Sequence, residues 1–139
     1  MRKTQLLLIV GVILGSSGLT AQTKPAAFTR ADTLRGALSP ERTCYNLTYY
    51  HLDVKVDPAK QSVNGSNEIY FTVIAPFTKM QIDLFKNMEI EKITLDDGAT
   101  VPFEREFNAV FVSLPKVLEK GSIHHIKVSY GGNPQVAKN

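Results

Sequence analysis

Residues 51–71 have the sequence HLDVKVDPAKQSVNGSNEIYF, in which two segments alternate between apolar and polar residues. Such alternation is typical of a β-strand that buries one face. The apolar face of the first segment holds Tyr50, Leu52, Val54 and Val56. The apolar face of the second, which continues past the quoted stretch, holds Ile69, Phe71 and Val73. The stretch therefore predicts two neighbouring, half-buried strands of a sheet.

The polar residues between the two segments predict a turn. Asp57 and Pro58 favour one, because proline presets φ and aspartate accepts a hydrogen bond from the backbone that follows it. Gly65 lies near the start of the second strand, where we expect it to permit a β-bulge.

The period of two begins at Tyr45 and continues along most of the chain. It places the second strand of the quoted stretch at residues 63–74 and predicts further strands over residues 80–84, 88–95, 101–103, 109–114 and 123–130. Asp97-Gly98 and Lys120-Gly121 are turn signals, and Pro115 is expected to end a strand because proline has no N–H for the ladder. Short strands separated by turn signals predict an all-β antiparallel fold, either a β-sandwich or an open barrel.

The first 21 residues have the three-part layout of a secretory signal peptide. A cationic start at residues 1–3 precedes an apolar core at residues 6–14, and small and polar residues follow. The apolar core is much shorter than the roughly 20 residues that a membrane-spanning helix needs. We therefore expect cleavage after Ala21, an exported protein in the periplasm or outside the cell, and no stable membrane span.

Residues 22–44 show no sustained period. They contain Pro25, Gly36 and Pro40, which predict an extended N-terminal arm that leads into the β-rich domain at residues 45–139 or drapes over it. Leu34 and Leu38 have the spacing of a short helical turn, which Gly36 between them weakens.

The charge balance argues against nucleic acid as a partner. The chain has 16 Lys and Arg against 13 Asp and Glu, a net charge of +3. Removal of residues 1–21 takes away Arg2 and Lys3, which leaves a net charge of +1 over 118 residues. No basic stripe remains to attract phosphates.

The histidines do not form a recognisable metal site in the sequence. His124 and His125 are adjacent in a strand, so their side chains should point to opposite faces. His51 lies on the polar face of another strand, and the chain has no H-E-x-x-H motif. A catalytic zinc site needs about three convergent ligands. We therefore expect no metal ligands in this chain.

The other candidate residues also favour a structural role. Cys44 is the single cysteine, so no intramolecular disulfide is possible, and we expect a small buried or half-buried side chain. Residues 96–98 lack the calcium-loop pattern and predict a solvated turn. Glu104 and Glu106 share one strand face, as is usual for a soluble surface. The sequence predicts no catalytic and no cofactor-binding residue.

Four stretches in this order resemble the N-terminal domain of M1-family zinc aminopeptidases, the gluzincins related to aminopeptidase N and leukotriene A4 hydrolase. The stretches are RADTLRGALSPER (30–42), YYHLDVKVDPAKQSVNGSNEIYF (49–71), MQIDLFKNMEIEKITLDDG (80–98) and VFVSLPKVLEKGSIHHIKVSYGGNP (110–134). The first is similar to a lead-in of secreted bacterial members. The second is similar to the family's opening hairpin, the third to its Leu-Asp-Leu strand and hairpin, and the fourth to its Leu-Pro, Leu-x-x-Gly and Tyr-x-Gly-x-Pro pattern.

This resemblance implies a saddle-like antiparallel β domain that packs on a thermolysin-like catalytic domain. In the family, that second domain carries H-E-x-x-H, a distal glutamate and G-x-M-E-N, none of which occurs in residues 1–139. We therefore expect a truncated M1 metallopeptidase with an incomplete β domain, inactive alone. Its expected partners are the missing catalytic domain, with zinc in the full-length parent, and the parent's peptide substrate. A free-standing exported β-sandwich that binds a protein or glycan is the alternative.

Export gives a first testable prediction. When the chain is expressed in a bacterium with a general secretion system, the exported form should begin at Gln22. Intact mass spectrometry of that form measures this directly. A secreted species that still carries Met1 would contradict the prediction of a cleaved signal.

Overall fold

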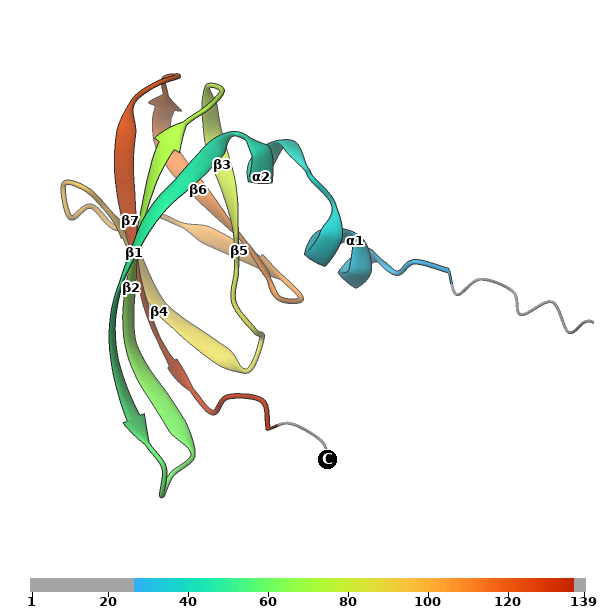
Figure 1. Cartoon of the computed structure of the whole chain (residues 1–139), viewed down its shortest axis with the longest axis vertical. Coiled ribbons are helices and arrows are strands. Elements are labelled where there is room, and N and C mark those ends of the chain that lie inside the picture. The colour runs from blue at the N-terminus through green and yellow to red at the C-terminus, as the bar shows by residue number, and fades with distance from the viewer. Residues whose placement is uncertain (1–26, 137–139) are drawn as a thin grey trace, which may run out of the picture.

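The computed structural model describes residues 27–136, so the predicted signal peptide lies outside the described residues. Two open antiparallel sheets face each other (Figure 1). One sheet contains, in spatial order, β1 (Tyr45–Asp57), β2 (Ser62–Val73), β7 (Ile123–Gly132) and β4 (Met88–Leu95). The other contains β3 (Phe77–Asp83), β6 (Ala109–Leu118) and β5 (Phe103–Glu106). The prediction of an all-β antiparallel fold is confirmed.

The first two strands form the predicted hairpin. The Asp57 carboxylate accepts a hydrogen bond from the Lys60 backbone N–H at 3.1 Å, which fixes the turn. The expected bulge at Gly65 is wrong, because Gly65 pairs in regular register with Val54. The bulge lies at the other end of the hairpin, between residues 47 and 49. Position 65 requires glycine for a different reason. A Cβ there would lie 2.0 Å from the Asp53 carbonyl oxygen, which is too close for any other residue.

The turn after β4 is also confirmed, whereas the end of β6 is not where the sequence predicts it. Gly98 has φ +81° and its N–H donates to the Leu95 carbonyl at 2.9 Å. Strand β6 continues past Pro115 to Leu118, although Pro115 was expected to end it. This is possible because the pairing of β3 with β6 is irregular here. Lys79 pairs with Ser113, whereas Phe77, two residues earlier, pairs with Leu118, five residues later. The proline lies in the irregular part, beyond the residues paired with β5, so few ladder bonds are lost.

The core lies between the two sheets. Its largest fully buried side chains are Phe71, Met80, Ile93, Ile126, Val73, Val110 and Val112. The Phe71 ring packs between Tyr45 and Phe77, with centroid distances of 5.5 and 6.2 Å. The second strand of the quoted stretch therefore has the buried apolar face that its alternation predicts.

The prediction of an extended arm is wrong for its described part, which contains α1 (Arg30–Gly36) and α2 (Pro40–Thr43). Thr29 and Asp32 form a capping box: the Thr29 side chain accepts from the Asp32 N–H, and the Asp32 carboxylate accepts from the Thr29 N–H. The carbonyl of Leu34, a buried residue, accepts from Gln81 at 3.0 Å and from Arg42 at 2.8 Å. The bond from Gln81 attaches the helical segment to β3, and the bond from Arg42 joins α2 to α1. No helix within residues 27–136 is long and apolar enough to cross a lipid bilayer.

The apolar face of β1 departs most from the sequence prediction. Leu52, Val54 and Val56 were expected to be buried, but 59%, 44% and 61% of their surfaces are exposed. Figure 1 shows why: the β1–β2 hairpin extends past the end of the three-stranded sheet. The covering sheet reaches Ile69 and Phe71 on β2, and it leaves the distal half of the hairpin open.

Candidate functional site

A polar cluster occupies the outer face of the four-stranded sheet, around Glu68. The Glu68 carboxylate accepts hydrogen bonds from the Lys127 ammonium at 3.2 Å and from the Tyr70 hydroxyl at 3.0 Å. His51 Nδ1 lies 3.8 Å from the same carboxylate. The hydrogen bond from Lys127, and then that from Tyr70, lower the pKa of Glu68, while the bond to Glu68 raises the pKa of Tyr70. A carboxylate held in its charged form by these donors is suited to an ion pair rather than to taking up a proton.

His124 and His125 point to opposite faces, as predicted. The His125 ring stacks on Tyr70 on the outer face at a centroid distance of 4.7 Å, whereas the His124 ring packs 6.2 Å from the core residue Phe71. Asp96 nevertheless contacts both rings. Its carboxylate lies 2.7 Å from His124 Nδ1 and 3.0 Å from His125 Nδ1, and it accepts from the His125 backbone N–H.

This cluster was not predicted from the sequence, because it depends on the register between β4 and β7. Strand β4 pairs with β7 as far as Leu95, opposite Ile126. The next residue, Asp96, therefore falls beside His125, at the point where β4 stops pairing. Its carboxylate takes the place of the next carbonyl of the ladder and accepts a hydrogen bond from the His125 backbone N–H of β7.

The described residues do not form a metal centre. Nowhere in residues 27–136 do three or more His, Cys, Asp or Glu side chains converge in a way that could hold a metal ion. Asp96 with its two histidines comes nearest, but the two rings approach it from opposite faces of the sheet. Zinc therefore does not fit the residues described here.

The remaining candidates have structural roles. Cys44 is buried as predicted, and burial raises the pKa of its thiol to about 11, so it is protonated at neutral pH. Glu104 pairs with Lys79 at 3.1 Å. Glu106 accepts two hydrogen bonds from the Arg30 guanidinium, both at 2.9 Å, and this pair attaches α1 to β5. Both carboxylates thus take part in ion pairs on the protein surface.

The turn at residues 96–98 is exposed to solvent. The Asp97 carboxylate accepts from the Ala99 N–H at 3.0 Å, which is a local turn bond. The predicted solvated turn is confirmed.

Several hollows indent the described surface, among them two that adjoin the helical segment. One, of about 270 Å³, lies beneath α1 and is mainly apolar, with Leu34, Leu84, Phe85 and Phe107 among its lining residues. The other, of about 280 Å³, lies where the two sheets diverge, and its lining includes Arg42, Tyr50, Asn67 and Tyr130. Neither brings together a nucleophile and a base. The apolar lining of the hollow beneath α1 suits packing against another surface.

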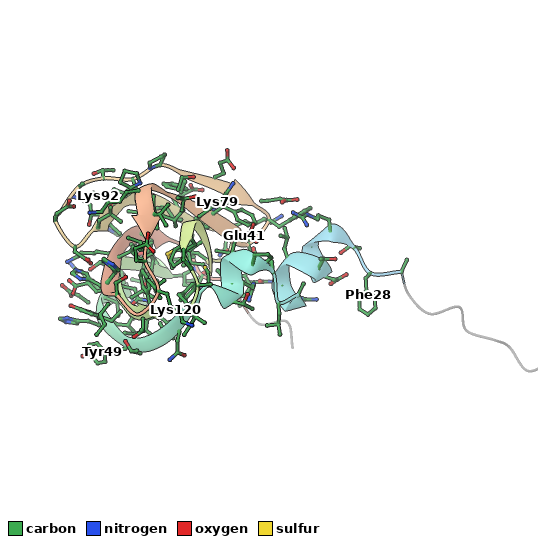
Figure 2. All side chains as sticks on the ribbon, turned by 90° about the horizontal axis from the view of Figure 1, so that it is seen from above. Phe28, Glu41, Tyr49, Lys79, Lys92 and Lys120 are labelled. Atoms are coloured by element: carbon green, nitrogen blue, oxygen red, sulfur yellow. The ribbon has the colours of Figure 1, made fainter. Side chains whose placement is uncertain are left out.

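Exposed apolar side chains give the clearest functional surface. We define the β1 face as Tyr50, Leu52, Val54 and Val56, which lie on one side of the distal hairpin and are all exposed. Other exposed aromatic residues point elsewhere: Figure 2 shows Phe28 before α1, away from the sheets, and Tyr49 on the outer side of β1. An apolar stripe of this kind on an edge strand marks an interaction surface.

Comparison with known proteins supports a specific fold. No family model matches the chain, and no curated protein matches it. Solved structures do match, among them a two-domain M1 zinc metallopeptidase variant bound to L-arginine, with a TM-score of 0.62 and 19% identity over 71% of this chain and 23% of that chain. A Deinococcus radiodurans M1 zinc metallopeptidase variant bound to a Tyr-Ser-Ala substrate has a TM-score of 0.61 and 20% identity, over 69% of this chain and 22% of that chain. A structure of the M1 zinc metallopeptidase from Deinococcus radiodurans has a TM-score of 0.59 and 18% identity, over 70% of this chain and 22% of that chain.

At 18–20% identity, this likeness shows a shared fold. The chain spans less than a quarter of the length of each of these structures. The fold is thus that of one part of larger M1 zinc metallopeptidases.

Proposed function

We propose that this chain is the non-catalytic N-terminal β domain of a secreted M1 zinc metallopeptidase. The parent protein would remove N-terminal residues from peptides. The observation that carries the proposal is that about 70% of the chain matches M1 zinc metallopeptidases in structure, while covering under a quarter of each. The order of the four resembling stretches over residues 30–134 supports the same assignment from the sequence.

In this proposal, the domain covers part of the catalytic domain and limits access to its cleft. The hollow beneath α1 supports such a role, because the exposed rings of Phe85 and Phe107 border it. A second domain that packs there would remove both rings from water, which is favourable by roughly 25 cal/mol for each Å² of apolar surface.

Zinc chemistry belongs, in this proposal, to the rest of the parent protein. The residues described here do not fit a zinc ion, since only Asp96, His124 and His125 lie together and they approach from different faces. We therefore assign no catalytic step to this chain.

The coding sequence after the codon for Asn139 tests the proposal. We expect G-x-M-E-N and H-E-x-x-H to follow in the same reading frame or, after a truncating change, in a displaced one. Downstream sequence without either motif would contradict the proposal and favour the free-standing binding module.

Zinc binding and peptidase activity give a further prediction. The purified chain should take up far less than one zinc ion per molecule and should release no amino acid from leucyl or alanyl reporter substrates. Equilibrium dialysis against zinc and a chromogenic assay measure the two properties. His51→Ala and His124→Ala serve as matched variants, and neither should alter the result. One tightly bound zinc per chain, lost in His124→Ala and kept in His51→Ala, would show that Asp96 and its histidines form a metal site.

A further inference from the structure

The two edge strands of the four-stranded sheet, β1 and β4, differ in how well they are protected against pairing with another chain. Strand β4 has eight residues, is interrupted by a bulge between Ile90 and Lys92, and carries Glu89 and Glu91. Short length, bulges and charge are the usual devices that keep an edge from pairing with another chain. Strand β1 has 13 residues, and its pairing with β2 is regular from Tyr49 to Asp57. In the described part of the chain, no strand pairs with its outer side.

The side chains of β1 match those of a second, antiparallel β1. When two copies pair about a two-fold axis perpendicular to the sheet at Val54, Asp53 of each copy lies opposite Lys55 of the other. The same register sets His51 opposite Asp57. Opposite charges directly across two strands are stabilising, and like charges are destabilising.

Neighbouring registers do not have this complementarity. An axis at Asp53 sets that carboxylate against its own copy, and an axis at Lys55 sets lysine against lysine. Only the register at Val54 brings two Asp53–Lys55 pairs together, because these residues flank the axis at equal distance. A self-complementary patch of this kind is what an isologous dimer requires.

The β1 face gains cover in the same register. The axis keeps both apolar faces on one side of the joined sheet, with Leu52 of one copy opposite Val56 of the other and the two Val54 side chains opposite each other. These side chains are 44–61% exposed in the single chain. Cross-strand packing of β-branched residues stabilises such pairs.

We propose that β1 pairs with β1 of a second copy of this chain, antiparallel and centred on Val54, so that the two four-stranded sheets become one eight-stranded sheet. The proposal stands independently of the proposed function, because it depends only on the edge strand and its charges.

Charge reversal at Asp53 and Lys55 tests the register without disturbing the fold. Within the chain, Asp53 lies opposite Ser66 and Lys55 opposite Asn64, and neither takes part in an ion pair among the described residues. Asp53→Lys alone and Lys55→Asp alone should each weaken the dimer about tenfold, because two attractive pairs become repulsive. Sedimentation velocity over a concentration series gives the dissociation constants.

Recombination of the variants separates this register from non-specific association. The double variant Asp53→Lys/Lys55→Asp should dimerise about as tightly as the unmodified chain. An equimolar mixture of the two single variants should form a heterodimer, since each then meets the opposite charges on its partner. Glu91→Lys, on the other edge strand, is the matched control and should not change the dissociation constant. All variants are prepared with the same residues before 27 and after 136, so association through those residues is common to all.

Two results would overturn the proposal. One is a monomer at every concentration. The other is association of equal strength in all variants, with no gain on mixing, which would indicate non-specific contact through the apolar side chains. Thermal unfolding of each variant confirms that a weaker dimer does not reflect an unfolded chain. Coding sequence beyond Asn139 has no bearing on either result, so the proposed function can fail while this proposal holds.

Discussion

Phe71→Ala is expected to lower the free energy of unfolding by about 3–5 kcal/mol. Phe71 is fully buried, and its ring lies between Tyr45 and Phe77 in the middle of the sandwich. Removal of the ring leaves a cavity that the two sheets cannot close, because each is held by its own ladder of backbone hydrogen bonds. A domain of this size has a total stability of about 5–15 kcal/mol. The loss is therefore a large fraction of the whole, and urea unfolding followed by circular dichroism measures it.

The matched control is Phe85→Ala, which removes a ring that is 56% exposed and should change stability by less than about 0.5 kcal/mol. Phe71→Leu keeps part of the volume and should lose about 1–2 kcal/mol, so it gives a measurement even where the alanine variant does not fold. Equal effects at Phe71 and Phe85 would contradict the core described here.

Most strands could be predicted because their alternation reports burial on one face. Ile69, Phe71 and Val73 have this pattern, and the three-stranded sheet covers all of them. Tyr50, Leu52, Val54 and Val56 have the same pattern, yet they are exposed. Alternation shows which residues share a face, but it does not show how far along the strand the opposite sheet extends. That limit comes from the length of β3, β5 and β6, which is a property of the tertiary structure.

The helices and the histidine cluster were missed for different reasons. The Thr29–Asp32 capping box is visible in the sequence as Thr-x-x-Asp, but Pro25, Gly36 and Pro40 nearby favoured an extended arm. Tertiary bonds from Gln81 and Arg42 to the Leu34 carbonyl then hold the last turn. The contact of Asp96 with His124 and His125 depends on the β4–β7 register, which two segments 28 residues apart do not disclose by their composition.

Gly65→Ala is the second change from which we expect a large effect, about 2–3 kcal/mol of lost stability. Gly65 lies on a central strand between Val54 of β1 and Tyr130 of β7. An added Cβ would lie 2.0 Å from the Asp53 carbonyl oxygen and 2.8 Å from the Val54 Cα. Both atoms belong to the backbone, so no side-chain rotation relieves the contact. The hairpin must therefore separate at this point, which costs ladder hydrogen bonds.

Gly36→Ala is the matched control for this change. Apart from its chain neighbours and the backbone of α1 itself, no atom lies within 4 Å of a Cβ at that position, and alanine has the higher helix propensity. Its stability should stay the same or rise by up to about 1 kcal/mol. Amide hydrogen exchange adds spatial detail: Gly65→Ala should reduce protection mainly at residues 52–56, and should also weaken any β1–β1 dimer, because the edge of the pair is no longer straight. Full protection of those amides in Gly65→Ala would show that β1 and β2 do not approach as closely as described.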